Sequence, residues 1–274
     1  MGKIIVFTDL DGTLLDEKTY SADLSLPALR NLQTLAISVV FCSSKTRVEQ
    51  EIIRRTLGVR DPFIVENGSA IIIPPNTVNI TERCNEELDG TKILVLGVPV
   101  EELRATLKKV VFTTGITYQS FHDLSNKQIA QITELDLESA QRAKTREFSE
   151  TIVSKFNTSE LETFISACEF QGLRCTFGGR FLSVIGKEAN KGRAVQLLTR
   201  YYRSQFGDIT TIGVGDSPND APMLNEVDFP YLVQRPNGQW RDLDVVNLNY
   251  ISAVGPVGFT EVVEDIKQRW LNQN

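Results

Sequence analysis

The chain has 274 residues, with 29 Lys and Arg against 35 Asp and Glu, so its formal net charge is −6. This balance argues against a nucleic acid or an anionic membrane as a dedicated partner. No apolar run approaches the roughly 18 residues of a membrane-spanning helix, and no secretory signal precedes the four cysteines, so we expect a cytoplasmic protein with free thiols. His122 is the only histidine, which excludes a multi-histidine metal site and disfavours a Ser-His-Asp triad.

The first third of the chain alternates apolar strands with helices. The first strand, Lys3–Thr8, contains a continuous apolar run, as a strand buried on both faces does. Thr46 and Glu49 form a capping box that begins a helix, and Gly58 ends that helix. Such alternation indicates a parallel α/β sheet. The other elements expected here are a helix at Leu26–Leu35 and strands at Ile37–Cys42, Phe63–Val65 and Ala70–Ile73.

From about Cys84 the pattern changes. Gly178-Gly179 is expected to join two strands of a hairpin, because a two-residue glycine connection suits the positive φ of hairpin turns. Hairpin plus helices predicts a separate α+β layer. The expected strands are Ile93–Val98, Ile152–Phe156, Leu173–Phe177 and Arg180–Ile185; the expected helices are Val100–Val111, Ser125–Leu135, Leu137–Phe148 and one from the Ser159/Glu162 capping box to near Gly172.

After Gly186 the parallel pattern resumes. The expected elements are helices at Lys191–Phe206, Pro222–Val227 and Thr260–Leu271 and strands at Thr210–Val214 and Tyr231–Val233. The sequence therefore predicts an α/β fold with a Rossmann-like parallel-sheet core that is interrupted by an inserted α+β domain. We place the first part of the core at residues 1–84, the inserted domain at 85–186 and the second part of the core at 187–274.

Two acidic residues directly follow the first predicted strand. Asp9 and Asp11 lie in the segment Asp9-Leu10-Asp11-Gly12-Thr13, where an extended backbone points both side chains to the same side. In open α/β sheets, ligands bind beyond the carboxyl ends of the strands. Paired carboxylates there can hold Mg²⁺, and one can attack phosphorus while the other moves a proton. The alternative, a surface turn, is disfavoured because this pattern arises by chance in roughly one chain in a hundred.

Three further segments suit the same chemistry. Ser43 ends a strand beside a helix N-terminus, where a hydroxyl can hold a phosphoryl oxygen, although serine also caps helices routinely. Lys191 opens a helix and can neutralise phosphoryl charge, although most lysines are simply solvated. Gly215–Asp220 follows a predicted strand and offers Asp216 and Asp220 as oxygen ligands for Mg²⁺; an Asx-rich turn is the alternative.

These four segments occur in the order of the four motifs of the haloacid dehalogenase superfamily, which the chain resembles. The resemblance implies a core with an inserted cap domain. It also implies phosphoryl transfer in which Asp9 attacks the phosphate and Asp11 protonates the leaving oxygen and then activates water. The residues implied to hold Mg²⁺ are Asp9, Asp216, Asp220 and the backbone carbonyl of Asp11, and those implied to hold the phosphoryl oxygens are Ser43 and Lys191.

Other segments resemble one family within that superfamily, the mannosyl-3-phosphoglycerate phosphatases. They are Ser43–Arg47, Asp61–Gly68, Arg146–Glu150, Gly179–Phe181 and Gly215–Leu224. This resemblance implies a small phosphorylated sugar acid as the substrate. Its carboxylate calls for arginine, so Arg146 and Arg180 are the candidates, with ordinary surface arginine as the alternative for both. The further substrate contacts that we expect are Ser44, Lys45 and Asn219.

Two alternative functions stay open. A phosphatase of the same fold could act on another sugar phosphate, for example the glucosyl analogue. A non-catalytic phospholigand sensor is disfavoured, because a pure binder needs neither Asp9 nor Asp11. The absence of a GxxxxGK[ST] loop from the sequence disfavours a kinase or other nucleotide enzyme.

Overall fold

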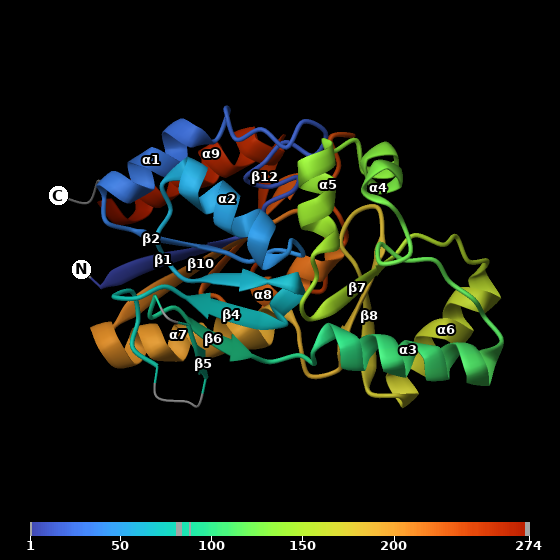
Figure 1. Cartoon of the computed structure of the whole chain (residues 1–274). Coiled ribbons are helices and arrows are strands. Elements are labelled where there is room, and N and C mark those ends of the chain that lie inside the picture. The colour runs from blue at the N-terminus through green and yellow to red at the C-terminus, as the bar shows by residue number, and fades with distance from the viewer. Residues whose placement is uncertain (1, 81–83, 88, 272–274) are drawn as a thin grey trace.

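The computed structural model describes residues 2–80, 84–87 and 89–271. Its central layer is a five-stranded sheet in the order β12-β11-β10-β1-β2, and every neighbouring pair is parallel (Figure 1). The strands are β1 (Lys3–Thr8), β2 (Ser38–Phe41), β10 (Ile209–Gly215), β11 (Phe229–Gln234) and β12 (Asn249–Val254). The predicted α/β class with a parallel core is confirmed.

Helices cover both faces of this sheet. Ile4 and Val6 of β1 pack in one apolar cluster with α1 (Leu26–Thr34) and α9 (Gly255–Ile266). Ile5 and Phe7, which alternate with them, pack on the opposite face with α7 (Lys191–Phe206) and α8 (Ala221–Leu224). The run Ile4–Phe7 within β1 is therefore continuously apolar because both faces of the strand are buried. A π-helical turn, Lys267–Leu271, follows α9.

The edge beside β2 leads into a second, antiparallel sheet. Helix α2 (Arg47–Leu57) begins at the predicted capping box of Thr46 and Glu49. The sheet has the order β3-β4-β6-β5, and the η1 turn (Glu66–Gly68) joins β3 to β4. Its strands are β3 (Phe63–Val65), β4 (Ala70–Ile73), β5 (Asn85–Glu86) and β6 (Lys92–Val95).

The pairing of β6 with β4 bears on where the inserted domain begins. Residues 85–95, which we placed in the inserted domain, contribute β5 and β6, and β6 pairs along its whole length with β4 of the core. Val98 is the first residue of the segment that packs on the apolar cluster of the inserted helices. The division of the chain stays a prediction, but β6 favours a boundary near residue 97 over one at 84.

The inserted region forms an α+β layer at one end of the parallel sheet, on the right in Figure 1. Three antiparallel strands in the order β7-β9-β8 carry helices α3 and α6 on the outer side, around a core that includes Leu103, Phe164 and Val184. The elements are α3 (Val100–Thr114), α4 (Asn126–Thr133), α5 (Leu137–Lys144), β7 (Ser149–Ile152), α6 (Thr158–Phe170), β8 (Leu173–Phe177) and β9 (Leu182–Gly186).

Several predicted elements are corrected by the structure. The strand expected at Ile152–Phe156 lies earlier, at β7. Its buried residues are mostly polar and are paired with other buried groups, such as Glu150 with Arg104, so the sequence lacks the apolar pattern of a buried strand. The capping box of α6 is Asn157 with Glu160, two residues before the expected Ser159 and Glu162. Phe177 pairs with Leu182, so four residues connect the hairpin instead of two. Strand β12, with its mixed polar sequence, was not predicted, and α9 begins at Gly255, earlier than expected.

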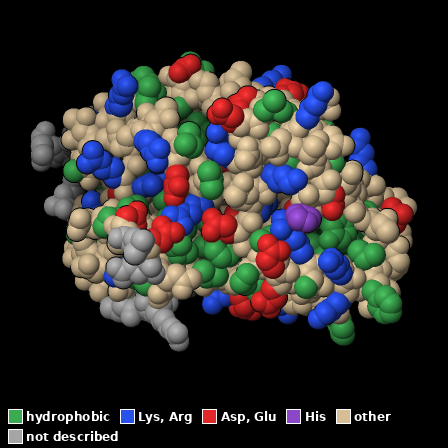
Figure 2. Space-filling view, viewed as in Figure 1, with side chains coloured by type: hydrophobic (Ala, Val, Ile, Leu, Met, Phe, Trp, Pro, Cys, Tyr) green, Lys and Arg blue, Asp and Glu red, His purple; other side chains and the backbone are tan. Residues whose placement is uncertain are grey.

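Acidic and basic side chains are interspersed on the face shown in Figure 2, and the purple histidine is exposed there. All four cysteines are free thiols. Within residues 2–80, 84–87 and 89–271, no helix combines the length and the apolar character needed to cross a membrane.

Candidate active site

The loops that carry the predicted motifs meet at one edge of the parallel sheet. Thr8 at the end of β1 lies opposite Val214 of β10 and Phe41 of β2, so the segments that follow these strands are neighbours. The N–H of Asp9 extends the pairing by donating to the Val214 carbonyl at 2.9 Å. The register alone therefore brings the first, second and fourth motifs together.

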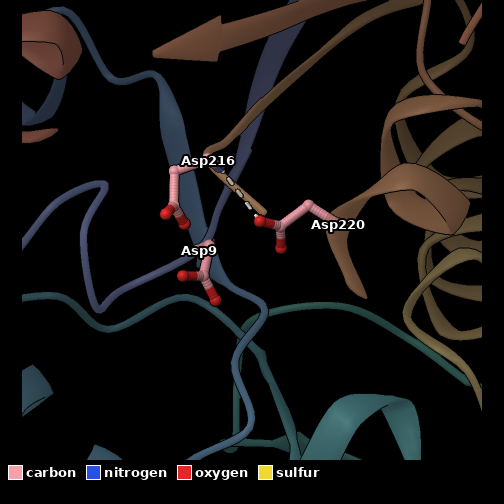
Figure 3. Close-up of side chains that lie close together, drawn as sticks. All are labelled: Asp9, Asp216 and Asp220. Atoms are coloured by element: carbon pink, nitrogen blue, oxygen red, sulfur yellow. Dashed lines mark hydrogen bonds between the residues drawn. The ribbon is translucent and has the colours of Figure 1, made fainter. Parts of the chain in front are cut away.

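Three carboxylates converge at this edge. Oxygens of Asp9, Asp216 and Asp220 all lie within 4.8 Å of one another, and the three residues are buried (Figure 3). Asp220 is oriented by the backbone, because its Oδ2 accepts the N–H groups of Asp216 and Ser217, each at 3.1 Å. A Cβ on Gly215 would lie 2.6 Å from the Cβ of Asp220, so this position requires glycine.

Two cations neutralise much of this charge. The Nζ of Lys191, 1% exposed, lies 2.6 Å from Asp9 Oδ1 and 2.7 Å from Asp220 Oδ1. The guanidinium of Arg235 lies 2.9 Å from Asp216 Oδ2 and also pairs with Glu17. Lys191 was expected here, but Arg235 and Glu17 were missed. Arg235 follows β11, the strand beside β10, so the strand-end rule used for the other loops also covers it.

The carboxylates and Lys191 perturb one another strongly. Burial raises the pKa of Asp9 from 3.8 to about 7, against the lowering effect of Lys191, and Asp220 adds to the rise. Burial followed by repulsion from Asp220 and Asp9 likewise raises the pKa of Asp216 well above its ordinary value. Burial lowers the pKa of Lys191, but the attraction of Asp220 and Asp9 outweighs burial and raises it, so this lysine stays a cation.

The donor set fits a hard divalent cation. It consists of carboxylate oxygens, which Mg²⁺ takes in proteins, and the three carboxylates face one another closely enough to share one ion. A bound cation would also lower the pKa values of Asp9 and Asp216, which burial and then repulsion between the carboxylates hold high. The structure therefore contains an acidic cluster that could bind a metal.

Asp11 lies beside this cluster and faces the adjoining cavity, which both Asp9 and Asp11 line. Its Oδ2 lies 2.9 Å from Lys45 Nζ, and the same ammonium lies 3.7 Å from Glu49 and over the ring of Tyr20. The other oxygen, Oδ1, has no hydrogen-bond partner within the described part of the chain. Asp11 is thus held through Oδ2 by Lys45, as Asp9 is held through Oδ1 by Lys191.

The second motif divides between the interior and the cavity. Ser43 is 1% exposed, and its Oγ accepts the N–H of Lys45 at 3.3 Å. Neither Ser43 nor Lys191 lines the cavity, whereas Ser44 and Lys45 do. Ser43, the serine expected to bind phosphate, is therefore buried behind the cavity wall, and the next residue, Ser44, lines the cavity.

Both candidate arginines of the inserted domain line the same cavity, but each already has protein partners. Arg146 donates to the Ser44 carbonyl at 3.1 Å. Arg180 donates to the Thr133 carbonyl at 2.8 Å and to the Tyr20 hydroxyl at 2.9 Å. Each arginine therefore links the inserted domain to a residue of the core, Ser44 or Tyr20. A ligand carboxylate would have to share the guanidinium donors with these protein partners.

The hairpin connection of the inserted domain touches the core loop of the fourth motif. A Cβ on Gly178 would lie 2.7 Å from Asn219 Nδ2, and Asn219 in turn donates to Asn67 Oδ1 at 3.0 Å. Asn219, Gly178 and Arg180 all line the cavity. The inserted domain thus closes over the carboxylates in this structure.

Two curated relatives match nearly the whole chain or most of it. The glucosyl-3-phosphoglycerate/mannosyl-3-phosphoglycerate phosphatase of Methanococcoides burtonii is 38% identical over 265 residues, which cover 96% of this chain and 97% of the relative. The mannosyl-3-phosphoglycerate phosphatase of Pyrococcus furiosus is 38% identical over 234 residues, which cover 84% of this chain and 90% of the relative.

Solved structures show the same fold at low identity. A Thermoplasma acidophilum protein gives a TM-score of 0.67 at 16% identity and covers 97% of this chain and 99% of its own. A haloalkanoate-superfamily phosphatase of Bacteroides thetaiotaomicron gives a TM-score of 0.64 at 18% identity, with 98% of this chain and 95% of its own covered. The family model for haloacid dehalogenase-like hydrolases matches residues 6–237. The resemblance inferred from the four motifs is therefore confirmed, and the chain belongs to the haloacid dehalogenase-like hydrolases.

Proposed function

We propose that the protein is a Mg²⁺-dependent phosphatase that hydrolyses 2-O-(α-mannosyl)-3-phosphoglycerate to mannosylglycerate, a compatible solute, and phosphate. The observation that carries the proposal is the pair Asp9 and Asp11 at the cavity, with Asp9 buried between Lys191 and two further carboxylates. The names of the two relatives at 38% identity support the substrate.

Asp9 would be the nucleophile. One carboxylate oxygen attacks phosphorus, the bond to the glycerate oxygen breaks, and an aspartyl-phosphate forms. Lys191, which holds Asp9 Oδ1 at 2.6 Å, keeps the carboxylate in place and offsets negative charge as the phosphate approaches. Ser43 and Ser44 supply the second motif's hydroxyls, and the exposure of Ser44 to the cavity favours it as a direct contact.

Asp11 would move the protons. It would protonate the departing alcohol oxygen and then take a proton from the water that hydrolyses the aspartyl-phosphate. An alcohol leaving group needs such an acid, and Asp11 lines the cavity with its side chain 32% exposed. Lys45 holds the opposite oxygen at 2.9 Å and so fixes the orientation of the carboxyl group.

Asp9, Asp216, Asp220 and the backbone carbonyl of Asp11 would hold Mg²⁺. The ion, when bound, would offset the electrostatic repulsion between the anionic nucleophile and the anionic phosphate. Arg235 would keep Asp216 oriented from the opposite side.

The inserted domain would act as a cap that excludes water and reads the substrate. Arg146 and Arg180 line the cavity and are the proposed partners of the glycerate carboxylate, with Lys45 and Asn219 as further contacts. Both arginines also hold protein carbonyls, so their protein contacts and the substrate would have to share the guanidinium donors. Arginines that bind the glycerate carboxylate would favour the phosphoglycerate over sugar phosphates that lack a carboxylate.

The second candidate is hydrolysis of the glucosyl analogue, which is favoured by the name of the Methanococcoides relative, since that name covers both sugars. A phospholigand sensor without activity is disfavoured by the presence of both Asp9 and Asp11.

A panel of phosphorylated metabolites, assayed for released phosphate with Mg²⁺ and with excess chelator, tests the function. The mannosyl phosphoglycerate should give the highest kcat/KM, and chelator should abolish turnover. Asp9→Asn should abolish turnover and phosphoenzyme, whereas Asp11→Asn should still form phosphoenzyme from an aryl phosphate, whose leaving group needs no acid. Wild-type turnover by Asp9→Asn, or equal kcat/KM for mannose 6-phosphate, would contradict the proposal.

A further inference from the structure

The turn Glu66–Ser69, called here the pivot turn, contacts the loops of three of the four motifs. The N–H of Asn67 donates to the Ser43 carbonyl at 3.0 Å, and Asn67 Oδ1 accepts from Asn219. A Cβ on Gly68 would lie 2.1 Å from the Asn190 carbonyl oxygen, directly before Lys191. One short turn thus contacts the loops of the second, third and fourth motifs.

The same turn contacts both chain segments that lead into and out of the inserted domain. The Ser69 carbonyl accepts the N–H of Leu96 at 2.8 Å and that of Gly97 at 2.9 Å. Gly186, at the end of the inserted domain, lies against Gly97, since a Cβ on it would be 3.3 Å from Gly97 Cα. The two connections therefore run side by side next to the pivot turn, where a hinge of the cap must lie.

Glu66 adds a direct grip on the inserted domain. It is 0% exposed, and its carboxylate accepts the N–H of Glu147 at 2.9 Å, the N–H of Phe148 at 3.1 Å and the hydroxyl of Ser149. Its φ of 48° is unusual for a residue with a side chain and indicates that the surroundings hold it in place. Burial raises the pKa of Glu66, against the lowering effect of Arg146 and of these hydrogen bonds.

Hydrogen bonds also connect Ser149 to the second motif through Arg146. Ser149, which donates to Glu66, also accepts from Arg146 Nη1 at 3.0 Å, and Arg146 Nη1 donates to the Ser44 carbonyl at 3.1 Å. Arg146 and Ser44 both line the cavity. A continuous set of contacts therefore runs from the pivot turn through the inserted domain to the second motif.

We propose that Glu66 is a positioning residue that sets the inserted domain, and with it Arg146, over the phosphate site. The inference rests on the proposed phosphatase function for its catalytic consequence, but the contact itself belongs to the structure. Without the Glu66 carboxylate, residues 147–149 lose all three of these hydrogen bonds. The Ser149 hydroxyl, which accepts from Arg146, is then no longer oriented by Glu66. A substrate that needs the cap should then react poorly, whereas a small phosphate ester that the core alone can process should react normally.

Glu66→Gln keeps the size of the side chain but replaces one acceptor oxygen with a donor NH₂ group. Misplacing a binding group by about 1 Å costs up to about 100-fold, so we expect kcat/KM for the mannosyl phosphoglycerate to fall about 10- to 100-fold. For p-nitrophenyl phosphate the change should stay within about threefold, because its small body makes little use of the cap. Hydrogen exchange at the amides of residues 147–149 should become faster, which reports the lost grip without any substrate.

Glu150→Gln is the matched control. Glu150 is also a buried carboxylate, 1% exposed, but among the described residues its side-chain partners are Arg104 and the N–H of Thr151, both inside the inserted domain. It should leave the ratio of the two kcat/KM values unchanged even if it lowers the melting temperature. Ser149→Ala removes one of the donors to Glu66 and should shift the ratio in the same direction by a smaller factor, which decides the matter if Glu66→Gln does not fold.

Equal losses on both substrates, or an unchanged ratio with unchanged exchange at residues 147–149, would overturn the positioning role. If the wild-type protein hydrolyses neither ester, the proposed function fails, and the exchange comparison alone then decides whether Glu66 holds the inserted domain.

Discussion

Lys191→Met tests the charge balance of the acidic cluster. Lys191 is buried and serves two carboxylates, Asp9 at 2.6 Å and Asp220 at 2.7 Å. Methionine preserves most of the aliphatic volume but removes the cation, so two buried carboxylates lose their partner. Arg235 stays on Asp216, at 2.9 Å, and cannot reach both of the others from there.

The structure sets the expected magnitude. Breaking a buried ion pair by removing one partner lowers the free energy of unfolding by about 3–5 kcal/mol, and the upper end applies because one lysine serves two acids. For a chain of this size each kcal/mol shifts the melting temperature by roughly 2–4 °C, so we expect a fall of roughly 10–20 °C in metal-free buffer. Mg²⁺ should restore much of it, since the ion supplies positive charge to the same carboxylates.

The assay is thermal unfolding of both proteins with excess chelator and with saturating MgCl₂. Arg193→Met, on the same helix, is the control, because Arg193 forms an exposed pair with Glu188 that should contribute less than about 1 kcal/mol. A fall in Lys191→Met no larger than that of the control would refute the reasoning. So would an equal Mg²⁺ effect on the wild-type and Lys191→Met proteins.

Three further predictions concern the same cluster. Because the pKa of Asp9 rises from 3.8 to about 7, the folded metal-free protein keeps a proton that the unfolded chain releases. Its stability should therefore fall as the pH rises through this interval while Mg²⁺ binds more tightly; unfolding and calorimetry across the pH range check both. Arg235→Gln should lower the melting temperature in chelator yet tighten Mg²⁺ binding, since one cation fewer stands beside the ion; weaker binding by calorimetry would contradict this. Gly215→Ala should weaken Mg²⁺ binding by about tenfold or more, because the added Cβ displaces Asp220, and calorimetry gives the value.

The parallel core and its motif loops were predictable from sequence for one physical reason. A strand buried on both faces is mostly apolar, so the run Ile4–Phe7 in β1 is easy to recognise, and polar residues directly after such strands have to lie at the same edge of the sheet. Asp9 and Asp216 follow from that rule alone. The rule also covers Arg235, but an arginine after a strand is common, and its partner Glu17 is more than two hundred residues away in the chain.

The inserted domain was less predictable because its polar residues are satisfied by distant partners. Strand β7 contains Ser149 and Glu150, which look solvated in sequence, yet they are buried on Glu66 and on Arg104. Glu66 itself stands in an Asn-Gly turn that signals only a hairpin. These contacts join residues that lie 46 and 83 positions apart in the chain, so no local pattern reveals them.

The charges at the site impose an order on binding. The three clustered carboxylates and Glu17, which shares Arg235 with Asp216, are matched by two cations, Lys191 and Arg235, which leaves two negative charges uncompensated when all four acids are ionised. A phosphate dianion that approaches this edge of the metal-free sheet is therefore repelled by a buried site, where charge is poorly screened. One divalent cation among the carboxylates cancels this excess negative charge. Inorganic phosphate should therefore bind measurably by calorimetry only when Mg²⁺ is present, and equal phosphate affinity in excess chelator would show that the cavity cations Lys45, Arg146 and Arg180 suffice without the cluster.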